Sequence, residues 1–187
     1  MRAKSHLRLG QKLADQYMSK LPHPCRRAFL LGCTQPDKNP TTYFKGSVRS
    51  QWLRGHNWSN AKRYICRLIW RLENKQQFKV MDYYALGKLI HYTADAFTYV
   101  HNDTFSARIK DHRNYEAALE AIFLPHLEKK EIQKSSCTSS CQCILFSCHK
   151  KYMKLPCSVS TDTRFICHVC STIMYRLIIK TSNHAKK

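Results

Sequence analysis

Histidine and carboxylate side chains recur through the middle third of the sequence at spacings that suit a metal site. The pairs His91/Asp95 and His112/Glu116 are each four positions apart, which on an α-helix places both side chains on one face, about one turn from each other. Neutral imidazole and ionised carboxylate are the usual ligands of catalytic zinc, and a site without thiolates generally keeps one coordination position for water. The pattern therefore predicts a zinc site at which chemistry can occur.

One such pair is weak evidence by itself, because a histidine four residues before an acid is more often part of a solvated surface pair. The segments around both pairs also carry long apolar sets, so the ligand candidates are expected to lie within or beside buried helix faces. The apolar positions are Tyr84, Leu86, Leu89, Ile90, Ala94 and Phe97 in the first segment and Ala117, Leu119, Ile122 and Phe123 in the second. The whole series therefore favours metal binding over surface ion pairs.

Two helices are predicted to carry this series. One covers about residues 78–102, and the next, which Asp111 can cap, is disturbed at Pro125. His101 follows His91 by ten residues, close to three helical turns. An unbroken helix would therefore place the two imidazoles on neighbouring faces and let one helix serve two metals.

The segments before His56 are predicted to begin with two helices. Ser5 can cap the first, which puts His6 in its first turn, and Pro22 opens a second, short helix that ends at Gly32. These helices are expected to bring the amino-terminal histidine toward the metal site.

A long loop is predicted over residues 34–54, because prolines and a glycine interrupt this stretch and no helical period appears in it. Long loops inside compact domains are usually functional, and this one contains Asp37. A further helix is predicted over about residues 57–73, with His56 at its start.

The remaining sequence predicts an all-α protein with one domain. The chain has 187 residues and a mass of 22.0 kDa, which suits a single domain over residues 1–187. Residues 128–143 are rich in lysine, serine and cysteine and are predicted to be a flexible connection. Residues 144–180 are predicted to form two closing helices that cover the core. Basic residues interrupt their apolar run, so no transmembrane segment is expected.

The cysteines and the other histidines are given structural interpretations. Seven of the ten cysteines lie between Cys137 and Cys170, but no second cysteine pair accompanies Cys167-His168-Val169-Cys170 at a regular distance, so free thiols are expected rather than a zinc knuckle. Without a secretory signal, disulfides are not expected either. The histidines outside the series are expected to be surface or capping residues: His23, His126, His149 and His184.

The ordered series resembles the bacterial zinc-dependent phospholipase C family, whose all-helical fold is shared with the single-strand-specific zinc nucleases of fungi and plants. Six elements occur in the order of the family: Ser5-His6-Leu7, Pro36-Asp37, Gly55-His56-Asn57, His91 with Asp95, His101, and His112 with Glu116. The resemblance covers about residues 3–124, and the connections before His56 differ in length from those of the secreted enzymes.

The resemblance implies a set of zinc ligands and two catalytic residues. The implied ligands are His6, Asp37, His56, His91, Asp95, His101, His112 and Glu116. Zinc held there would lower the pKa of a water molecule toward neutrality and polarise the phosphate. Asp95 would bridge two metals and set their separation, and Asp37 is either a zinc ligand or the general base that orients the attacking water.

The amino terminus departs from the family. The secreted phospholipases begin, after processing, with a tryptophan whose amino group and carbonyl bind one zinc, whereas this sequence begins Met1-Arg-Ala-Lys-Ser-His6. His6 is expected to lie too near the start for the same arrangement. The resemblance therefore implies two zinc ions, and it leaves open whether a third, held by His6 and Asp95, is lost or is retained with water in place of the amine.

The function implied is zinc-dependent hydrolysis of a phosphodiester, with a phospholipid as the first choice of substrate. A nuclease of the same fold that acts on single-stranded nucleic acid is the alternative enzyme, and a non-catalytic zinc-bound lipid-binding protein is the alternative outside enzymes. The formal charge of +20 favours an anionic partner, either phospholipid headgroups at a membrane surface or a nucleic-acid backbone. No signal peptide is apparent, so a cytoplasmic location is expected.

Overall fold

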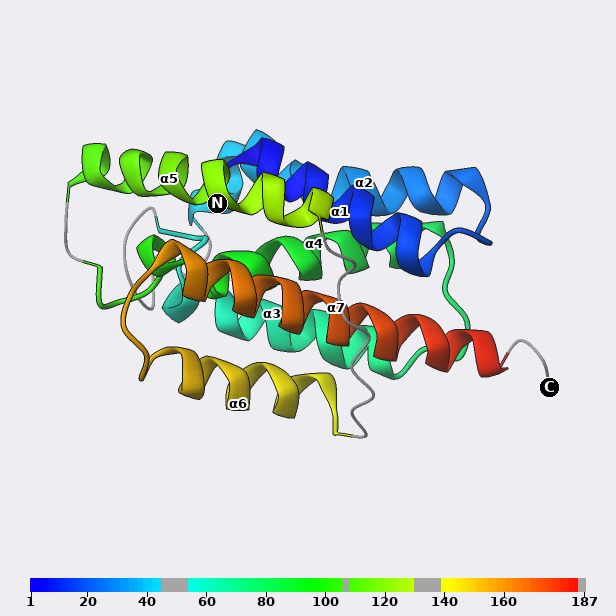
Figure 1. Ribbon diagram of the computed structural model, residues 1–187. Coiled ribbons are helices and arrows are strands. Elements are labelled where there is room, and N and C mark those ends of the chain that lie inside the picture. The colour runs from blue at the N-terminus through cyan, green and yellow to red at the C-terminus, as the bar shows by residue number, and fades with distance from the viewer. Residues whose placement is uncertain (45–53, 106–107, 130–138, 185–187) are drawn as a thin grey trace.

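The computed structural model describes residues 1–44, 54–105, 108–129 and 139–184. These residues form seven α-helices and two short 3-10 helices, with no strand among them, so the predicted all-α class is confirmed. The elements are α1 (Ala3–Tyr17), α2 (His23–Lys38), η1 (Pro40–Phe44), α3 (Trp58–Glu73), α4 (Val80–Ala96), η2 (Tyr99–His101), α5 (Ile109–Lys129), α6 (Cys141–Tyr152) and α7 (Val159–His184). Figure 1 shows α4 in the middle, with α1, α2 and α5 on one side and α3, α6 and α7 on the other.

Helix α4 is the central helix because almost every one of its side chains is apolar or has a polar partner inside the bundle. Leu86, Leu89 and Ile90 are buried, and so are His91 and Asp95 in its second half. A helix that is buried on all sides must pair its polar groups internally, since each unpaired one would carry a desolvation penalty. The polar cluster around His91 and Asp95 therefore requires partners from neighbouring elements.

The packing of α2 on α4 depends on two glycines that face each other. A Cβ atom at Gly32 would overlap the carbonyl oxygen of Tyr84, and one at Gly87 would overlap that of Phe29. Gly32 therefore lies inside α2 and permits close approach of the two helices. The prediction that the second helix ends at Gly32 is wrong, because the missing side chain serves packing rather than termination.

The continuation of α2 changes the setting of Asp37. The residue lies in the last turn of α2, which ends at Lys38, and not in a long loop. The predicted loop over residues 34–54 is therefore wrong for its first part, where α2 is followed directly by η1; residues 45–53 lie outside the described residues. A helical position holds the Asp37 carboxylate more rigidly than a loop would.

Helix α4 is shorter than the sequence predicted. It ends at Ala96, and His101 lies on η2, so the two histidines do not share one unbroken helix. The side-chain amide of Asn102 donates hydrogen bonds to the carbonyl oxygens of Ala96 (3.2 Å) and Thr98 (3.0 Å). These bonds satisfy carbonyl groups that a continuing helix would have used, and the chain turns so that His101 points back toward α4.

The first helix also begins differently from the prediction. Helix α1 starts at Ala3, with His6 in its first turns, and the hydroxyl of Ser5 donates to Glu120 on α5 (3.3 Å) instead of capping α1. The predicted helix over residues 57–73 is confirmed by α3.

The carboxyl-terminal region closes the bundle as predicted. Helix α5 continues past Pro125 to Lys129, and α6 and α7 pack over the core. Most of the predicted connection over residues 128–143, namely 130–138, lies outside the described residues. Among the helices that are described, none is long and apolar enough to cross a membrane.

Candidate metal centre

The eight candidate ligands predicted from the sequence meet in one region of the bundle. They form three groups, within each of which the potential ligand atoms lie within 4.8 Å of one another: His6, His91 and Asp95; Asp37, His56 and His91; and His101, His112 and Glu116. Five elements and the turn before α3 contribute to them, so the groups exist only in the folded chain.

His91 is held with one ring nitrogen directed at the cluster. Its Nδ1 lies 2.9 Å from the carbonyl oxygen of Cys33 on α2 and must donate the hydrogen, because a carbonyl can only accept. In the neutral ring Nε2 then carries the lone pair, and it lies 3.2 Å from Asp95 Oδ2 and 3.6 Å from Asp37 Oδ1. A backbone carbonyl that fixes the tautomer in this way is typical of metal-binding histidines.

His56 is oriented in a similar way by Thr42 on η1. The Thr42 hydroxyl lies 2.7 Å from the carbonyl oxygens of both Pro36 and Asn39 and has one hydrogen to give them. The His56 Nε2–H therefore donates to Thr42 Oγ1 (3.1 Å). This leaves the lone pair on Nδ1, which lies 3.0 Å from Asp95 Oδ2 and 3.8 Å from Asp37 Oδ1.

Asp95 is fully buried, and its two oxygens face different partners. Oδ2 is directed at His56 and His91, whereas Oδ1 lies 3.1 Å from His6 Nε2 and 2.9 Å from the amine of Met1. Burial alone would raise the pKa of this carboxyl, but the Met1 ammonium and the surrounding imidazoles hold it well below its usual range. Asp95 is therefore an ionised carboxylate between two sets of nitrogen atoms, which is the arrangement that a bridging role needs.

Burial also sets the protonation state of His6. Its ring stacks on that of His91 with centroids 3.7 Å apart. Exclusion of water and the neighbouring imidazole lower the pKa of His6 to about 4, with only partial compensation from Asp95. The ring is therefore neutral at neutral pH, which is the form that binds metal.

The third group joins η2 to α5. Nε2 of His101 and Nε2 of His112 each lie 3.3 Å from Oε1 of Glu116. Burial and the Met1 ammonium lower the pKa of His101 to about 4. For Glu116, burial raises the pKa, but the same ammonium and the two histidines outweigh it and depress the pKa strongly. The neutral ring of His101 and an ionised carboxylate therefore lie side by side.

The amine of Met1 lies between the groups, although His6 was expected to lie too near the start for an arrangement like that of the secreted enzymes. Its nitrogen is 2.9 Å from Asp95 Oδ1, 2.8 Å from Glu116 Oε1 and 2.8 Å from His101 Nε2, to which it donates. Burial lowers its pKa, but the carboxylates outweigh this effect and raise the pKa to about 10. A single positive charge thus occupies the point where the negative charges converge.

The residues present fit zinc. With the tautomers that Cys33 and Thr42 select, Nε2 of His91, Nδ1 of His56 and Oδ2 of Asp95 are acceptors that face one another, and a bound cation would satisfy them. Their separations of 3.0–3.2 Å for the closest pairs are near the roughly 3.3 Å between ligand atoms on one tetrahedral zinc. In addition, Asp37 Oδ2 and His101 Nδ1 are buried without a hydrogen-bond partner among the described residues.

Comparison with known families agrees with this donor set. The family model for zinc-dependent phospholipase C matches residues 5–156 of the 187. The chain belongs to this family. The match extends beyond the 3–124 recognised from the motifs and takes in α6. Neither the search of curated proteins nor the search of solved structures found a match.

As expected for a zinc-dependent phospholipase C, a cleft opens beside the candidate ligands. It has a volume of about 610 Å³ and reaches Asp37, His56, His101, His112 and Glu116. Its other lining residues are Met1, Arg2, Ala3, Tyr43, Arg54, Asn57, Val100, Phe105, Ile109 and Arg113. Residues of the second and third groups therefore line a space that a substrate can enter, and the first group lies buried behind them.

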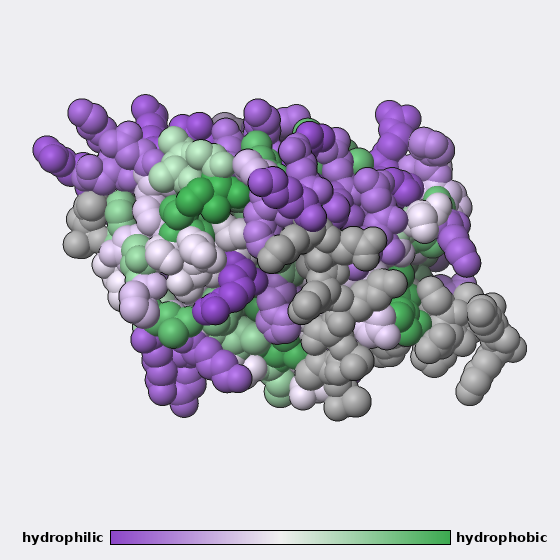
Figure 2. Space-filling view, viewed as in Figure 1, coloured by the Kyte–Doolittle hydropathy of each residue, from purple (hydrophilic) through white to green (hydrophobic). Residues whose placement is uncertain are grey.

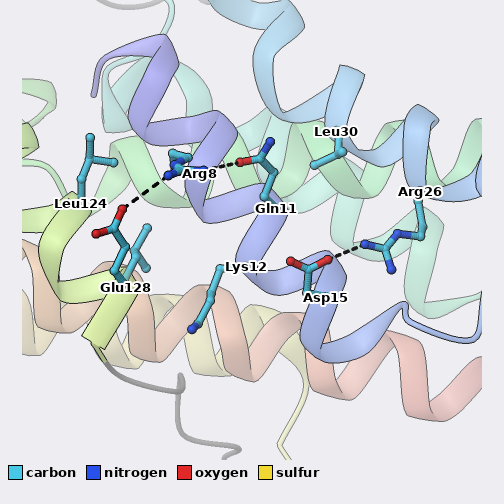
Figure 3. A pocket seen from close by; sticks show the side chains of 9 residues that line it. Arg8, Gln11, Lys12, Asp15, Arg26, Leu30, Leu124 and Glu128 are labelled. Carbon is cyan, nitrogen blue, oxygen red and sulfur yellow. Dashed lines mark hydrogen bonds and ion pairs between the residues drawn. The ribbon is translucent and has the colours of Figure 1, made fainter.

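A second groove differs from the cleft in its chemistry. It has a volume of about 500 Å³ and lies between α1, α2 and α5 (Figure 3). Four of its charged side chains are paired with one another: Arg8 with Glu128, and Arg26 with Asp15. It shares no lining residue with the cleft beside the candidate ligands.

The sequence interpretation missed Asp162 on α7, beyond the residues that the family model matches. This fully buried carboxylate accepts hydrogen bonds from the Tyr99 amide (2.9 Å) and the Tyr115 hydroxyl (2.9 Å) through Oδ2, and from the Tyr152 hydroxyl (2.8 Å) through Oδ1. Tyr99 begins η2, and Tyr115 precedes Glu116. Asp162 therefore ties both segments of the third ligand group to the closing helices; no spacing rule marked it.

Two tyrosine variants can show whether Asp162 positions the third ligand group or only stabilises the fold. We expect Tyr115→Phe to weaken zinc binding by the third group about tenfold, because α5 loses its hydrogen bond to Asp162. Tyr152→Phe removes the bond to the other oxygen from α6, and we expect about 1 kcal/mol of destabilisation with zinc affinity unchanged. Zinc competition with a chelator and urea unfolding measure the two effects; an equal loss of affinity in both variants would contradict the positioning role.

His149 was predicted to be a surface or capping residue, and this prediction is wrong. Its ring is buried, stacks on Trp58 with centroids 4.0 Å apart, and bonds to Asn102 Oδ1 (2.9 Å). Because Asn102 also caps the end of α4, His149 supports the turn that carries His101. The cysteine prediction is confirmed for the described residues, in which all nine cysteines are free.

Proposed function

We propose that the protein is a phospholipase C that hydrolyses the phosphodiester between diacylglycerol and the headgroup phosphate of a phospholipid. The observation that carries the proposal is the convergence of imidazole nitrogen and carboxylate atoms beside an open cleft. Membership of the zinc-dependent phospholipase C family supports the reaction class.

The residues of the chain would hold and orient the reacting groups. His56, His91 and Asp95 would form the inner metal site, with Asp95 shared with His6. Zinc bound there supplies Lewis-acid polarisation of the phosphate and acidifies a water molecule. The neutral His6 ring and the ionised Asp95 carboxylate are already in the ionisation states for metal binding.

Asp37 is the candidate for handling the proton of the attacking water. Its Oδ1 faces His56 and His91 at 3.8 Å and 3.6 Å, longer than the corresponding contacts of Asp95. Its Oδ2 has no hydrogen-bond partner in the described structure, and the residue lines the cleft. An oxygen with a vacant acceptor position at the cleft suits a general base, and ligation through the other oxygen is compatible with it.

The apolar part of the cleft favours a lipid over a nucleic acid. Val100, Phe105 and Ile109 line it, and Ile109 is 76% exposed at the start of α5. The exposed aliphatic side chain of Ile109 beside the candidate metal site suits the glycerol and acyl portion of a phospholipid.

The test is zinc-dependent turnover on matched substrates. We expect the zinc-loaded protein to release diacylglycerol from short-chain phospholipids, to lose this activity in chelator and to regain it when zinc is restored. Single-stranded DNA under the same conditions distinguishes the nuclease. Cleavage of DNA without lipid hydrolysis would replace the proposal, and zinc binding without either activity would favour the non-catalytic alternative.

A further inference from the structure

When the candidate metal ligands are left out, the charged side chains that line the cleft are all basic. Arg2, Arg54 and Arg113 line it, and its two acidic lining residues are Asp37 and Glu116. Both carboxylates belong to the metal groups. Among the described lining residues, no carboxylate remains to meet a cationic part of a substrate.

The other acidic residues of the described chain have partners elsewhere. Asp82 pairs with Arg71 at 2.8 Å, and Glu120 pairs with Arg2 at 3.5 Å. Asp162 is enclosed by its tyrosines. In sequence, residues 45–53, which connect η1 to Arg54, contain two basic residues and no acid.

Metal binding would make the imbalance larger. Asp37, Asp95 and Glu116 are the carboxylates of the three groups, so even two zinc ions exceed their negative charge. Figure 2 shows hydrophilic residues dominating the upper edge of the molecule, over α5, α1 and α2. The positive electrostatic potential of the metal-loaded cleft would therefore repel an ammonium headgroup.

Among the described residues that line the cleft, the aromatic rings do not take the place of the missing carboxylate. A quaternary ammonium can be bound by a cage of aromatic faces. Here the Tyr43 ring stacks on His56, with centroids 4.9 Å apart, and Phe105 meets Tyr99 and His112 edge to face. These rings contact the ligand histidines and their supports instead of forming an open cage.

We propose that the cleft selects phospholipids whose headgroup has no ammonium group, of the glycerol or inositol type, and that Arg113 contacts that headgroup. This inference rests on the proposed function. Arg113 follows His112 on α5 and lines the cleft, and its guanidinium can donate to phosphate and hydroxyl oxygens. A choline or ethanolamine headgroup would place its positive charge against the same guanidinium.

The test compares dihexanoyl phosphatidylglycerol with dihexanoyl phosphatidylcholine below their micelle concentrations, so that attraction to a charged surface plays no part. Diacylglycerol, the common product, is measured. We expect kcat/KM for the glycerol lipid to be at least about tenfold higher. In Arg113→Glu we expect this ratio to fall about tenfold, mainly through KM. Arg27 is exposed near the start of α2, at the end away from Asp37. Arg27→Glu changes the net charge by the same amount as Arg113→Glu, and we expect it to leave the ratio of the two kcat/KM values unchanged.

Binding of glycerol phosphate and phosphocholine to the zinc-loaded protein, measured by calorimetry, separates the two proposals. Selective binding of glycerol phosphate with no turnover of either lipid would refute the phospholipase reaction and support the selectivity. Equal turnover and equal binding, or preference for choline, would overturn the selectivity and leave the reaction standing. An equal effect of Arg113→Glu and Arg27→Glu would overturn the role of Arg113.

Discussion

Asp95→Asn is expected to lose one equivalent of zinc and to reduce phospholipid hydrolysis by at least about a hundredfold, while the helical fold persists. The variant keeps the size of the side chain and one oxygen. It removes the negative charge that lies between His6 on one side and His56 and His91 on the other. It also directs an amide N–H group at atoms that need a cation.

The matched control is Asp103→Asn, which makes the same chemical change at an exposed residue after η2. Zinc content by elemental analysis, diacylglycerol release at saturating zinc, and far-ultraviolet circular dichroism should be measured for both variants. We expect Asp103→Asn to match the original protein in all three. Similar rates for the two variants would remove the bridging role and, with it, the inner site as described.

Loss of one histidine ligand should have a different effect in each part of the centre. We expect His112→Ala to lose one zinc and to lower the thermal midpoint only when zinc is present, because His112 is half-buried at the rim of the cleft and its contribution to stability comes through the metal. When the free zinc concentration is about a hundred times the Kd of a site, zinc binding there adds about 2.7 kcal/mol to the free energy of unfolding.

His91→Ala should lower stability with and without zinc. The ring is fully buried, contacts His6 and His56, and satisfies the carbonyl of Cys33, so its removal leaves a cavity and an unpaired acceptor as well as a lost ligand. Thermal unfolding of both variants, each in zinc and in chelator, measures the difference. If His112→Ala were as destabilising in chelator as in zinc, the third group would be a structural hydrogen-bond cluster.

Helical periodicity in the sequence was sufficient to predict the fold class, α3 and the two closing helices. Local spacing was also sufficient to group His91 with Asp95 and His112 with Glu116, because residues four apart on a helix are neighbours whatever the helix packs against. The single-domain organisation, the cytoplasmic location and the ligand roles themselves stay predictions.

Helix ends were the weakest part of the sequence interpretation. Gly32 was taken as a stop signal, whereas its role depends on Gly87 of another helix. The end of α4 depends on the Asn102 side chain, which bonds to carbonyls that a helix would otherwise use. Local propensity cannot decide such cases, because the competing contacts come from residues that only the fold brings near.

The sequence by itself determined which residue types could hold zinc and the order in which they occur. Only the tertiary structure decided that Met1 reaches the site, that the backbone of Cys33 fixes the tautomer of His91, and that Asp162 holds η2 to α5. The physical reason is that ligand chemistry belongs to side chains and can be read from residue identity. The orientation and protonation of those side chains depend on burial and on hydrogen-bond partners that are distant in the sequence.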